Sequence, residues 1–311
     1  MSRQHSSGDL IADRRYAYAE ACLAEGDPAA AAEMAEQALE RAPAYAPAWA
    51  LLGRAREALS TPEAALNAYA SALANDPEDR LGIGVALARL GAAGEGAALS
   101  SAYVRTLFDG YSDRFEAHLV GALGYRGPEM LRAALDGLPE APVRFASVLD
   151  LGCGTGLMGV AIRDRAERIA GVDLSPAMLA KARAKGLYAR LVAGDLLDFL
   201  NGEPPASADL VLAADVFIYL PDLVPVLAGV ARVLAPGGLT AFTIQSHAGA
   251  EPVRLGADAR YAHSDAHLAA SAEAAGLAVR LLAPAAIRRE RGEGVPGRIA
   301  VLAAPDGACT P

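Results

Sequence analysis

The sequence predicts a chain of two parts, an all-α repeat domain followed by an α/β domain built on a mostly parallel sheet. Three observations predict this fold class. Residues 11–95 are rich in Ala, Leu and Glu and nearly free of strand signals. Similar positions recur in this region at a spacing of 34 residues. From residue 146 onward, short apolar runs alternate with helical stretches, which is typical of a parallel sheet covered by helices on both faces.

The N-terminal repeat is defined by small residues and prolines. A shift of 34 residues aligns Ala38 with Ala72 and Pro43 with Pro77. Small alanines let paired helices approach closely, and each proline ends a helix because its ring cannot continue the hydrogen-bond ladder. This pattern resembles the tetratricopeptide repeat. The expected units are two full repeats and a terminal half-unit within a domain of residues 11–96: 12–45, 46–79 and 80–90.

The large side chains of Trp49 and Tyr69 are expected to fill the gaps between neighbouring hairpins. Two roles for the repeats stay open on the sequence alone. They can offer a concave surface to a partner peptide or protein, or they can serve as a packing or dimerisation module without a ligand.

Composition excludes several classes of function. The formal net charge is −9, and the densest basic stretch, residues 288–291, is interrupted by an acid. Nucleic acid is therefore not an expected partner, because proteins that grip phosphate backbones carry basic patches. No run of 18 apolar residues predicts a membrane span.

The three cysteines, Cys22, Cys153 and Cys309, are far apart and odd in number. With no CxxC pattern and no Cys/His cluster, we expect no disulfide framework, no metal site and a cytoplasmic location. The first ten residues lack the apolar core of a signal peptide and are expected to form a disordered leader, and residues 306–311 a tail.

The α/β part is expected to span residues 136–305. Its predicted strands are 146–151, 168–173, 188–193, 208–214, 238–245, 277–283 and 297–304. The predicted helices between them are 156–165, 176–185, 221–233 and 264–275.

A glycine-rich loop follows the first predicted strand at once. Its residues are Gly152, Cys153, Gly154, Thr155 and Gly156. Glycines let the backbone turn sharply and let a ligand approach without a Cβ in the way. In such sheets the ligand lies at the carboxyl ends of the strands, where the strand order reverses.

The spacing within this loop separates two cofactors. The dinucleotide fingerprint is GxGxxG, whereas the third glycine here is Gly156 and gives GxGxG. Asp150 precedes the first glycine by two residues, where its carboxylate would repel a pyrophosphate and attract an ammonium group. S-adenosylmethionine has an amino-acid tail and a sulfonium but no phosphate, so the loop favours it over NAD.

Residues 148–156 (VLDLGCGTG) resemble the first motif of class I S-adenosylmethionine-dependent methyltransferases. The resemblance implies a Rossmann-like, seven-stranded, mostly parallel sheet, S-adenosylmethionine as cofactor, methyl transfer as the activity, and contacts to the cofactor from Asp150 and the loop residues 152–156.

Two further acids occupy matching positions after later strands. Asp173 ends the second strand, followed by Leu174, and a carboxylate can bridge a diol with its two oxygens. The resemblance implies that Asp173 accepts from both ribose hydroxyls; the alternative is an N-cap at Pro176, a role that Ser175 fills better.

The third strand is followed by Asp195. The resemblance implies that its carboxylate accepts from the adenine amino group while Leu196 packs on the ring, the alternative being an ordinary turn aspartate. Asp215 ends the fourth strand and is expected to face the methyl group or the acceptor.

Over residues 11–304 the chain resembles the bacterial tetratricopeptide-repeat methyltransferases. The similarity rests on the repeats, FDGYSDRFEAHL at 108–119, the cofactor domain, and the segments 260–264 and 289–293. It implies chemistry but no substrate. Residues 97–135 are expected to form a linker and lid helices.

The spacing of Phe108, Tyr111 and Phe115 places them on one helical face, unless Gly110 breaks the helix. By analogy, Tyr111 and Phe115 fold over the methionine moiety as a lid, the alternative being a helix packed on the core. The fourth-strand segment is not the Asn-Pro-Pro-Tyr type, which weakens a nucleobase amine as acceptor.

A base is needed only if the acceptor arrives protonated. The candidates near the rim are His263, His247, Tyr219 and Tyr261. Arg260 and Arg289 can recognise a substrate carboxylate or form solvated salt bridges.

The sequence thus predicts a methyltransferase that acts on a small-molecule or protein acceptor. The alternative is a non-catalytic interaction protein whose cofactor domain serves as a scaffold.

Overall fold

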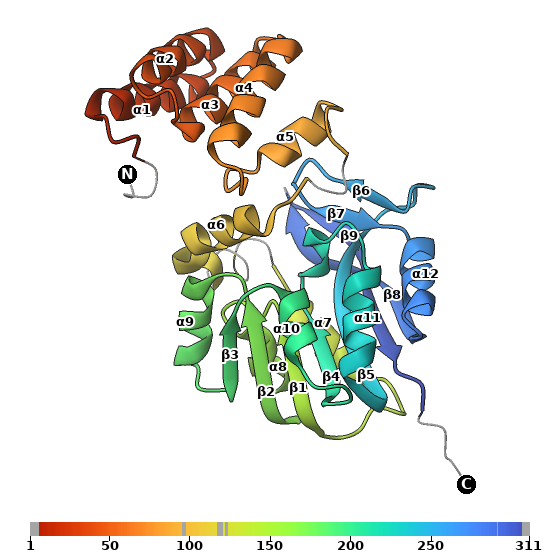
Figure 1. Cartoon of the computed structure of the whole chain (residues 1–311). Coiled ribbons are helices and arrows are strands. Elements are labelled where there is room, and N and C mark those ends of the chain that lie inside the picture. The colour runs from red at the N-terminus through yellow and green to blue at the C-terminus, as the bar shows by residue number, and fades with distance from the viewer. Residues whose placement is uncertain (1–5, 95–97, 117–120, 122–123, 291, 307–311) are drawn as a thin grey trace. The chain divides into compact units, whose positions relative to one another are not determined.

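The structure is a computed structural model that describes residues 6–94, 98–116, 121, 124–290 and 292–306. The chain divides into two compact units, Met1–Thr106 and Leu107–Pro311 (Figure 1). The division falls inside α6 (Ser101–Tyr111), ten residues after the end expected for the repeats. Residues 1–5 of the expected leader, 307–311 of the tail, and 95–97, 117–120 and 122–123 of the linker and lid segment lie outside the described residues.

The N-terminal unit consists of helical hairpins, as the 34-residue spacing predicts. Its helices are α1 (Leu10–Ala24), α2 (Pro28–Arg41), α3 (Ala46–Ala58), α4 (Pro62–Asn75) and the shorter α5 (Ile83–Arg89). Asp9, in the expected leader, N-caps α1 by accepting from the N–H groups of Ile11 and Ala12. Asp27 caps α2 in the same way. These caps satisfy backbone donors that an α-helix leaves without partners.

Small residues make room for large ones where the hairpins pack. A Cβ on Gly53 would lie 2.4 Å from the ring of Tyr69, so only glycine fits there. The hydroxyl of Tyr69 donates to Glu57. Trp49 packs between the two apolar clusters of this unit, and its Nε1 donates to the carbonyl of Pro43 at 2.7 Å. The predicted filling of the gaps by Trp49 and Tyr69 is confirmed.

The C-terminal unit is an α/β domain on one sheet. All seven predicted strands are present: β1 (Phe145–Leu151), β2 (Ala166–Asp173), β3 (Arg190–Ala193), β4 (Ala208–Ala213), β5 (Leu234–Ser246), β8 (Ala278–Glu290) and β9 (Glu293–Ala303). They pair in the order β3-β2-β1-β4-β5-β9-β8, with β9 antiparallel to both neighbours and the other pairs parallel. The predicted α/β fold class is confirmed.

The sheet has nine strands rather than the expected seven. The additional strands, β6 (Val253–Leu255) and β7 (Tyr261–His263), have three residues each and pair antiparallel with each other. β7 also pairs in parallel with the last two residues of β5. Three residues are too few to show the period-2 alternation by which strands are predicted.

Helices pack on both faces of the sheet, as predicted (Figure 1). One face packs against α7 (Gly127–Asp136) and α8 (Leu157–Ile162). The other packs against α10 (Leu196–Gly202), α11 (Val224–Val233) and α12 (Asp265–Ala274). In addition, α9 (Pro176–Ala184) follows β2, and the 3-10 helix η5 (Phe217–Tyr219) follows β4. The seven-residue α10 was not predicted.

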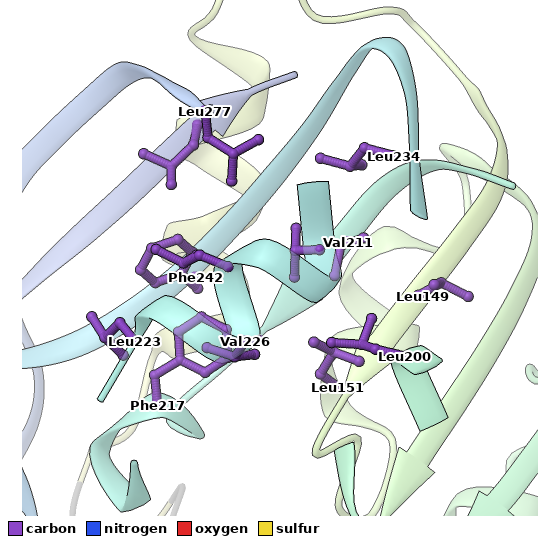
Figure 2. Close-up of a cluster of buried hydrophobic side chains, with 14 of the residues drawn as sticks. Leu149, Leu151, Leu200, Val211, Phe217, Leu223, Val226, Leu234, Phe242 and Leu277 are labelled. Atoms are coloured by element: carbon purple, nitrogen blue, oxygen red, sulfur yellow. The ribbon is translucent and has the colours of Figure 1, made fainter. Parts of the chain in front are cut away.

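The larger core lies between the sheet and α10 and α11. Figure 2 shows Leu151, Val211 and Phe242 from three strands gathered against Leu200 of α10 and Val226 of α11. All five side chains are almost completely buried. Burying apolar surface stabilises a fold by about 25 cal/mol per Å². This core therefore holds the strands, and the loops that follow them, in fixed positions.

The strand order reverses at β1, which pairs with β2 on one side and with β4 on the other. The loops that follow these strands therefore meet at one rim, which is where ligands bind in this class of sheet. Among the described residues, none of the helices is long and apolar enough to cross a membrane.

Candidate functional site

The glycine loop after β1 turns through the left-handed region of backbone space. Gly152, Gly154 and Gly156 have φ values of 61°, 53° and 90°. L-residues reach this region at a cost, whereas glycine has no Cβ to clash. A Cβ on Gly152 would meet Val216 at 2.5 Å, while one on Gly154 would meet nothing within 4 Å. The loop thus leaves open space beside Gly154.

Asp173, at the end of β2, is attached directly to this loop. Its Oδ2 accepts from the N–H of Gly154 at 2.8 Å, and its Oδ1 accepts from the N–H of Ser175 at 2.9 Å. Ser175 N-caps α9, as predicted, by accepting from Met178. Burial raises the pKa of Asp173 above its usual range. Each carboxylate oxygen keeps a further lone pair for another donor.

Asp150 lies deeper, at the end of β1. Its side chain is 1% exposed, and Oδ2 accepts from the hydroxyl of Tyr188 at 2.6 Å. Burial raises the pKa of Asp150 to about 7, and the Tyr188 bond acts in the opposite direction. Tyr188 was not identified from the sequence, which placed it only at the start of a strand.

Asp195, after β3, is the N-cap of α10, because its Oδ1 accepts from the N–H of Leu197 at 2.7 Å. Asp195 therefore does have the local structural role that the sequence analysis gave as the alternative to cofactor binding. Leu196, the first residue of α10, is half-buried at the same place, and a Cβ on the preceding Gly194 would meet nothing within 4 Å. Open space thus adjoins the third strand end as well as the first.

Asp215, two residues beyond β4, has an unusual backbone for a residue other than glycine. Its φ is 62°, and its N–H donates to Thr243 Oγ1 on β5 at 2.8 Å. Its carboxylate accepts from Nη1 of Arg288 at 2.9 and 3.2 Å. Strained backbone of this kind persists when surrounding contacts determine it, and it is found at functional sites.

Arg288 is the cation of this region that the sequence missed. Its side chain is 2% exposed, and Nη2 donates to Gln245 at 2.9 Å and to Asp258 at 3.4 Å. The sequence analysis named the adjacent Arg289, whose side chain is exposed. An irregularity in the β8–β9 pairing between Ala286 and Arg289 interrupts the alternation, so that two adjacent residues, Ile287 and Arg288, are both buried. Alternation alone therefore does not show which arginine faces inward.

Arg260 and Tyr219 lie next to the Arg288 network. Arg260 forms a salt bridge with Asp258 at 3.4 Å and donates to the hydroxyl of Tyr219 at 3.5 Å. Arg260 therefore forms a salt bridge, which the sequence analysis gave as the alternative to recognition of a substrate carboxylate. Burial raises the pKa of Tyr219, so its hydroxyl stays protonated at neutral pH and is a poor base.

Aromatic rings from α6 gather at the same place. Phe108 meets Tyr219 edge to face at 5.7 Å between ring centres, and Phe115 meets both Phe108 and Tyr111 at 6.0 and 5.7 Å. α6 continues through Gly110, so Phe108 and Tyr111 lie on one helix, whereas Phe115 follows the 3-10 helix η3 (Ser112–Arg114). The predicted single helical face is therefore interrupted after Tyr111, although the ring of Phe115 contacts both of the others. The lid role of Tyr111 and Phe115 stays a prediction.

Asp109 ties the end of α6 to the end of β2. Its Oδ1 accepts from the hydroxyl of Ser175 at 2.5 Å, and Ser175 is adjacent to the loop that carries Asp173. The end of α6 is thus held beside Asp173, the acid that ends β2.

The histidines are less suited to catalysis than the sequence suggested. His263 is fully buried, its Nε2 lies 3.4 Å from the carbonyl of Phe217, and burial lowers its pKa to about 4. This position argues against a base that exchanges protons at the rim. His247 is half-buried, and its Nδ1 accepts from the N–H of Gly249 at 3.1 Å. Tyr261, the fourth candidate base, is fully buried.

No group of His, Cys, Asp and Glu within the described ranges could hold a metal ion. Cys22 and Cys153 are buried free thiols, and Cys309 lies outside the described residues.

Family profiles match both units. Residues 148–238 match a methyltransferase domain, and residues 12–55 match a tetratricopeptide repeat. The chain is 28% identical over 135 residues to a ubiquinone biosynthesis O-methyltransferase of Xylella fastidiosa, an alignment covering 40% of this chain and 55% of the relative. It is 40% identical over 116 residues to a trans-aconitate 2-methyltransferase of Methylobacterium nodulans, covering 36% and 44%. The chain spans about half the length of the curated relatives it matches.

Solved structures share the fold at low identity. The 4+2 cyclase SpnF has a TM-score of 0.54 at 17% identity, covering 66% of this chain and 96% of the cyclase. The 1,6-didemethyltoxoflavin-N1-methyltransferase of Burkholderia thailandensis has a TM-score of 0.50 at 21% identity, covering 66% and 89%. These similarities show the fold alone.

The predicted family is confirmed at the level of domains. Residues 148–238 match a methyltransferase domain, and a match to a tetratricopeptide repeat precedes it in the chain.

Proposed function

We propose that this chain is an S-adenosylmethionine-dependent methyltransferase whose acceptor is an oxygen atom of a small molecule that is already anionic at neutral pH. The observation that carries the cofactor half of the proposal is the open space at Gly154, a residue whose N–H is bonded to the carboxylate of Asp173.

The donor set fits this cofactor better than a dinucleotide. In a dinucleotide site, backbone N–H groups of the glycine loop and the following helix face a pyrophosphate. Here the N–H of Gly154 is already occupied by Asp173 Oδ2. A phosphate would also meet two carboxylates, whereas a ribose diol and an ammonium group are both attracted to them.

We assign each acid a part of the cofactor. Asp173 would accept from the ribose hydroxyls with the lone pairs that Gly154 and Ser175 leave. Asp150 would attract the ammonium of the amino-acid tail, and its burial strengthens that attraction because little water screens it. Asp195 would accept from the adenine amino group, beside Leu196. The remaining contacts would come from the loop residues 152–156, Leu174 and Tyr111.

The acceptor would bind beyond the fourth strand. Asp215, Tyr219, Arg260 and Arg288 meet there, beneath the ring of Phe108. Arg260 is half-buried and can pair with an anionic acceptor in addition to Asp258. The names of three curated relatives point to acceptors that carry oxygen. They are a ubiquinone biosynthesis O-methyltransferase, a trans-aconitate 2-methyltransferase and a malonyl-(acyl-carrier protein) O-methyltransferase.

The protonation states of this region favour an acceptor that needs no base. His263 is buried and neutral at pH 7, and the hydroxyl of Tyr219 stays protonated. A carboxylic acid is ionised at that pH and can attack directly. The bound cofactor supplies the electrophilic methyl group, while the protein aligns the acceptor and excludes water. Alignment alone can lower the barrier by roughly 7–11 kcal/mol.

Calorimetric titration with S-adenosylmethionine tests the cofactor half. Binding is expected, and no heat with millimolar cofactor would overturn the proposal. The second measurement is release of S-adenosylhomocysteine with panels of small carboxylic acids, phenols and amines. Turnover with a carboxylic acid is expected; turnover with phenols or amines alone would contradict the acceptor class.

An interaction protein with an idle cofactor domain is the competing function. It predicts cofactor binding without S-adenosylhomocysteine release in any of the panels or with any protein fraction. Similarity to the cyclase SpnF shows that this fold is also found in a protein named for a different reaction.

A further inference from the structure

Tyr188, which lies between α9 and β3, occupies a slot that three glycines create. A Cβ would lie 3.0 Å from its ring atoms at Gly156, 2.5 Å from its hydroxyl at Gly159, and 3.0 Å from its ring at Gly171. These glycines belong to the N-cap of α8, the body of α8, and β2. Three glycines on two elements, α8 and β2, therefore make the room in which this one ring packs.

The hydroxyl of Tyr188 makes two bonds at the bottom of the slot. It donates to Oδ2 of Asp150 at 2.6 Å and accepts from the N–H of Gly159 at 3.2 Å. Asp150 ends β1 and Gly159 lies in the first turn of α8, so the hydroxyl joins the two elements that flank the glycine loop.

We propose that Tyr188 is a positioning residue of the cofactor site, whose hydroxyl fixes the carboxylate of Asp150 that would recognise the amino-acid tail of the cofactor. The proposal rests on the proposed function and names a residue that acts through Asp150 rather than on the cofactor itself.

The physical argument starts from the burial of Asp150. A buried carboxylate needs hydrogen-bond donors, because an ionised group removed from water is otherwise costly. The charged and titratable groups that face Asp150 are Asp173, Cys153, Tyr125 and Tyr188. Of these four, Tyr188 donates a hydrogen bond to the carboxylate, whereas the charge of Asp173 favours the neutral form.

Loss of the Tyr188 hydroxyl is therefore expected to raise the pKa of Asp150 above its value of about 7. At neutral pH more of the carboxyl would be protonated, and its attraction for an ammonium group would fall. The ribose and adenine contacts would not change, since they involve other strand ends.

Tyr188→Phe tests this division, because the ring still fills the slot. The probes are S-adenosylmethionine and 5′-methylthioadenosine, which lacks the amino-acid tail. We expect the variant to bind S-adenosylmethionine about tenfold more weakly, as loss of a hydrogen bond to a charged group implies, and to bind methylthioadenosine within about twofold of wild type. The acid limb of the pH dependence of S-adenosylmethionine binding should also move to higher pH.

Tyr69→Phe is the matched control. Tyr69 is also a buried tyrosine whose ring packs on a glycine, Gly53, and whose hydroxyl donates to a carboxylate, Glu57. It lies in the repeat unit, so its substitution should leave the affinities for both probes unchanged.

The outcomes separate the two proposals. If wild type binds neither probe, the proposed function fails. If wild type binds and Tyr188→Phe binds S-adenosylmethionine equally well, or loses both probes equally, the positioning role is overturned. Asp150→Asn leaves the slot untouched and is the second variant: unchanged affinity for S-adenosylmethionine in this variant also overturns the role, whether or not Tyr188→Phe folds.

Discussion

Arg288 on β8 donates two hydrogen bonds to Asp215, which follows β4 and lies 73 residues earlier in the chain. The two strands are not neighbours in the sheet, because β5 and β9 lie between them. The long arginine side chain therefore reaches Asp215 across two intervening strands, and its burial makes the pair sensitive to the loss of either partner.

Arg288→Ala should lower the free energy of unfolding by about 3 kcal/mol, because removing one partner leaves Asp215 without its buried counter-charge. Urea denaturation measures this difference. The adjacent Arg289→Ala is the control: its side chain is exposed, and a change within about 0.5 kcal/mol is expected. Equal losses in the two variants would show that burial of Arg288 does not stabilise the fold.

Local patterns were sufficient to predict the architecture. The alternation of apolar runs with helical stretches marked all seven long strands, and the spacing of Gly152, Gly154 and Gly156 marked the loop after β1. Both signals lie within a few residues, where sterics and side-chain periodicity act directly.

Contacts between distant residues could not be predicted in this way. The bond between Tyr188 and Asp150 spans 38 residues, and the bulge that buries Arg288 depends on pairing with β9. The burial of His263 depends on its short strand pairing with the end of β5. No local spacing encodes these relationships.

Gly154→Ala should separate cofactor binding from folding. A Cβ at this position meets no protein atom, so the stability loss should be limited to the left-handed backbone, about 1–2 kcal/mol. The methyl group would occupy the open space assigned to the cofactor, so affinity for S-adenosylmethionine should fall at least about tenfold. Calorimetry and thermal unfolding measure the two effects.

The control for Gly154 is Gly91→Ala in the repeat unit. Gly91 also has a positive φ, 71°, and no atom within 4 Å of a Cβ. It should lose similar stability with unchanged cofactor affinity. A full retention of affinity in Gly154→Ala would place the cofactor elsewhere.

Asp173→Ala should weaken S-adenosylmethionine and 5′-methylthioadenosine equally, because both carry the ribose assigned to this carboxylate. This differs from Asp150→Asn, whose effect should be confined to the ligand with the tail. Asp209→Ala is the structural control, since Asp209 likewise accepts from two backbone N–H groups, at 2.7 and 3.0 Å, at the start of β4. If Asp209→Ala weakens both ligands as much as Asp173→Ala, the ribose assignment is wrong.

The burial of His263 predicts a specific dependence of stability on pH. Burial lowers the pKa of His263 from 6.5 to about 4, so the folded state keeps this side chain neutral in a range where the unfolded chain protonates it. Because the unfolded state then binds more protons, this contribution to stability is fully present above pH 6.5 and is lost as pH falls toward 4.

Urea denaturation at pH 7.0, 6.0 and 5.0 measures this effect of His263. The free energy of unfolding should fall with decreasing pH, with a slope from this residue that approaches the uptake of one proton per molecule on unfolding. His263→Gln, which cannot titrate, should show a smaller slope by that amount, and methyl transfer near pH 7 should keep its pH profile in this variant. A shifted pH profile instead would restore His263 as a proton-transferring residue.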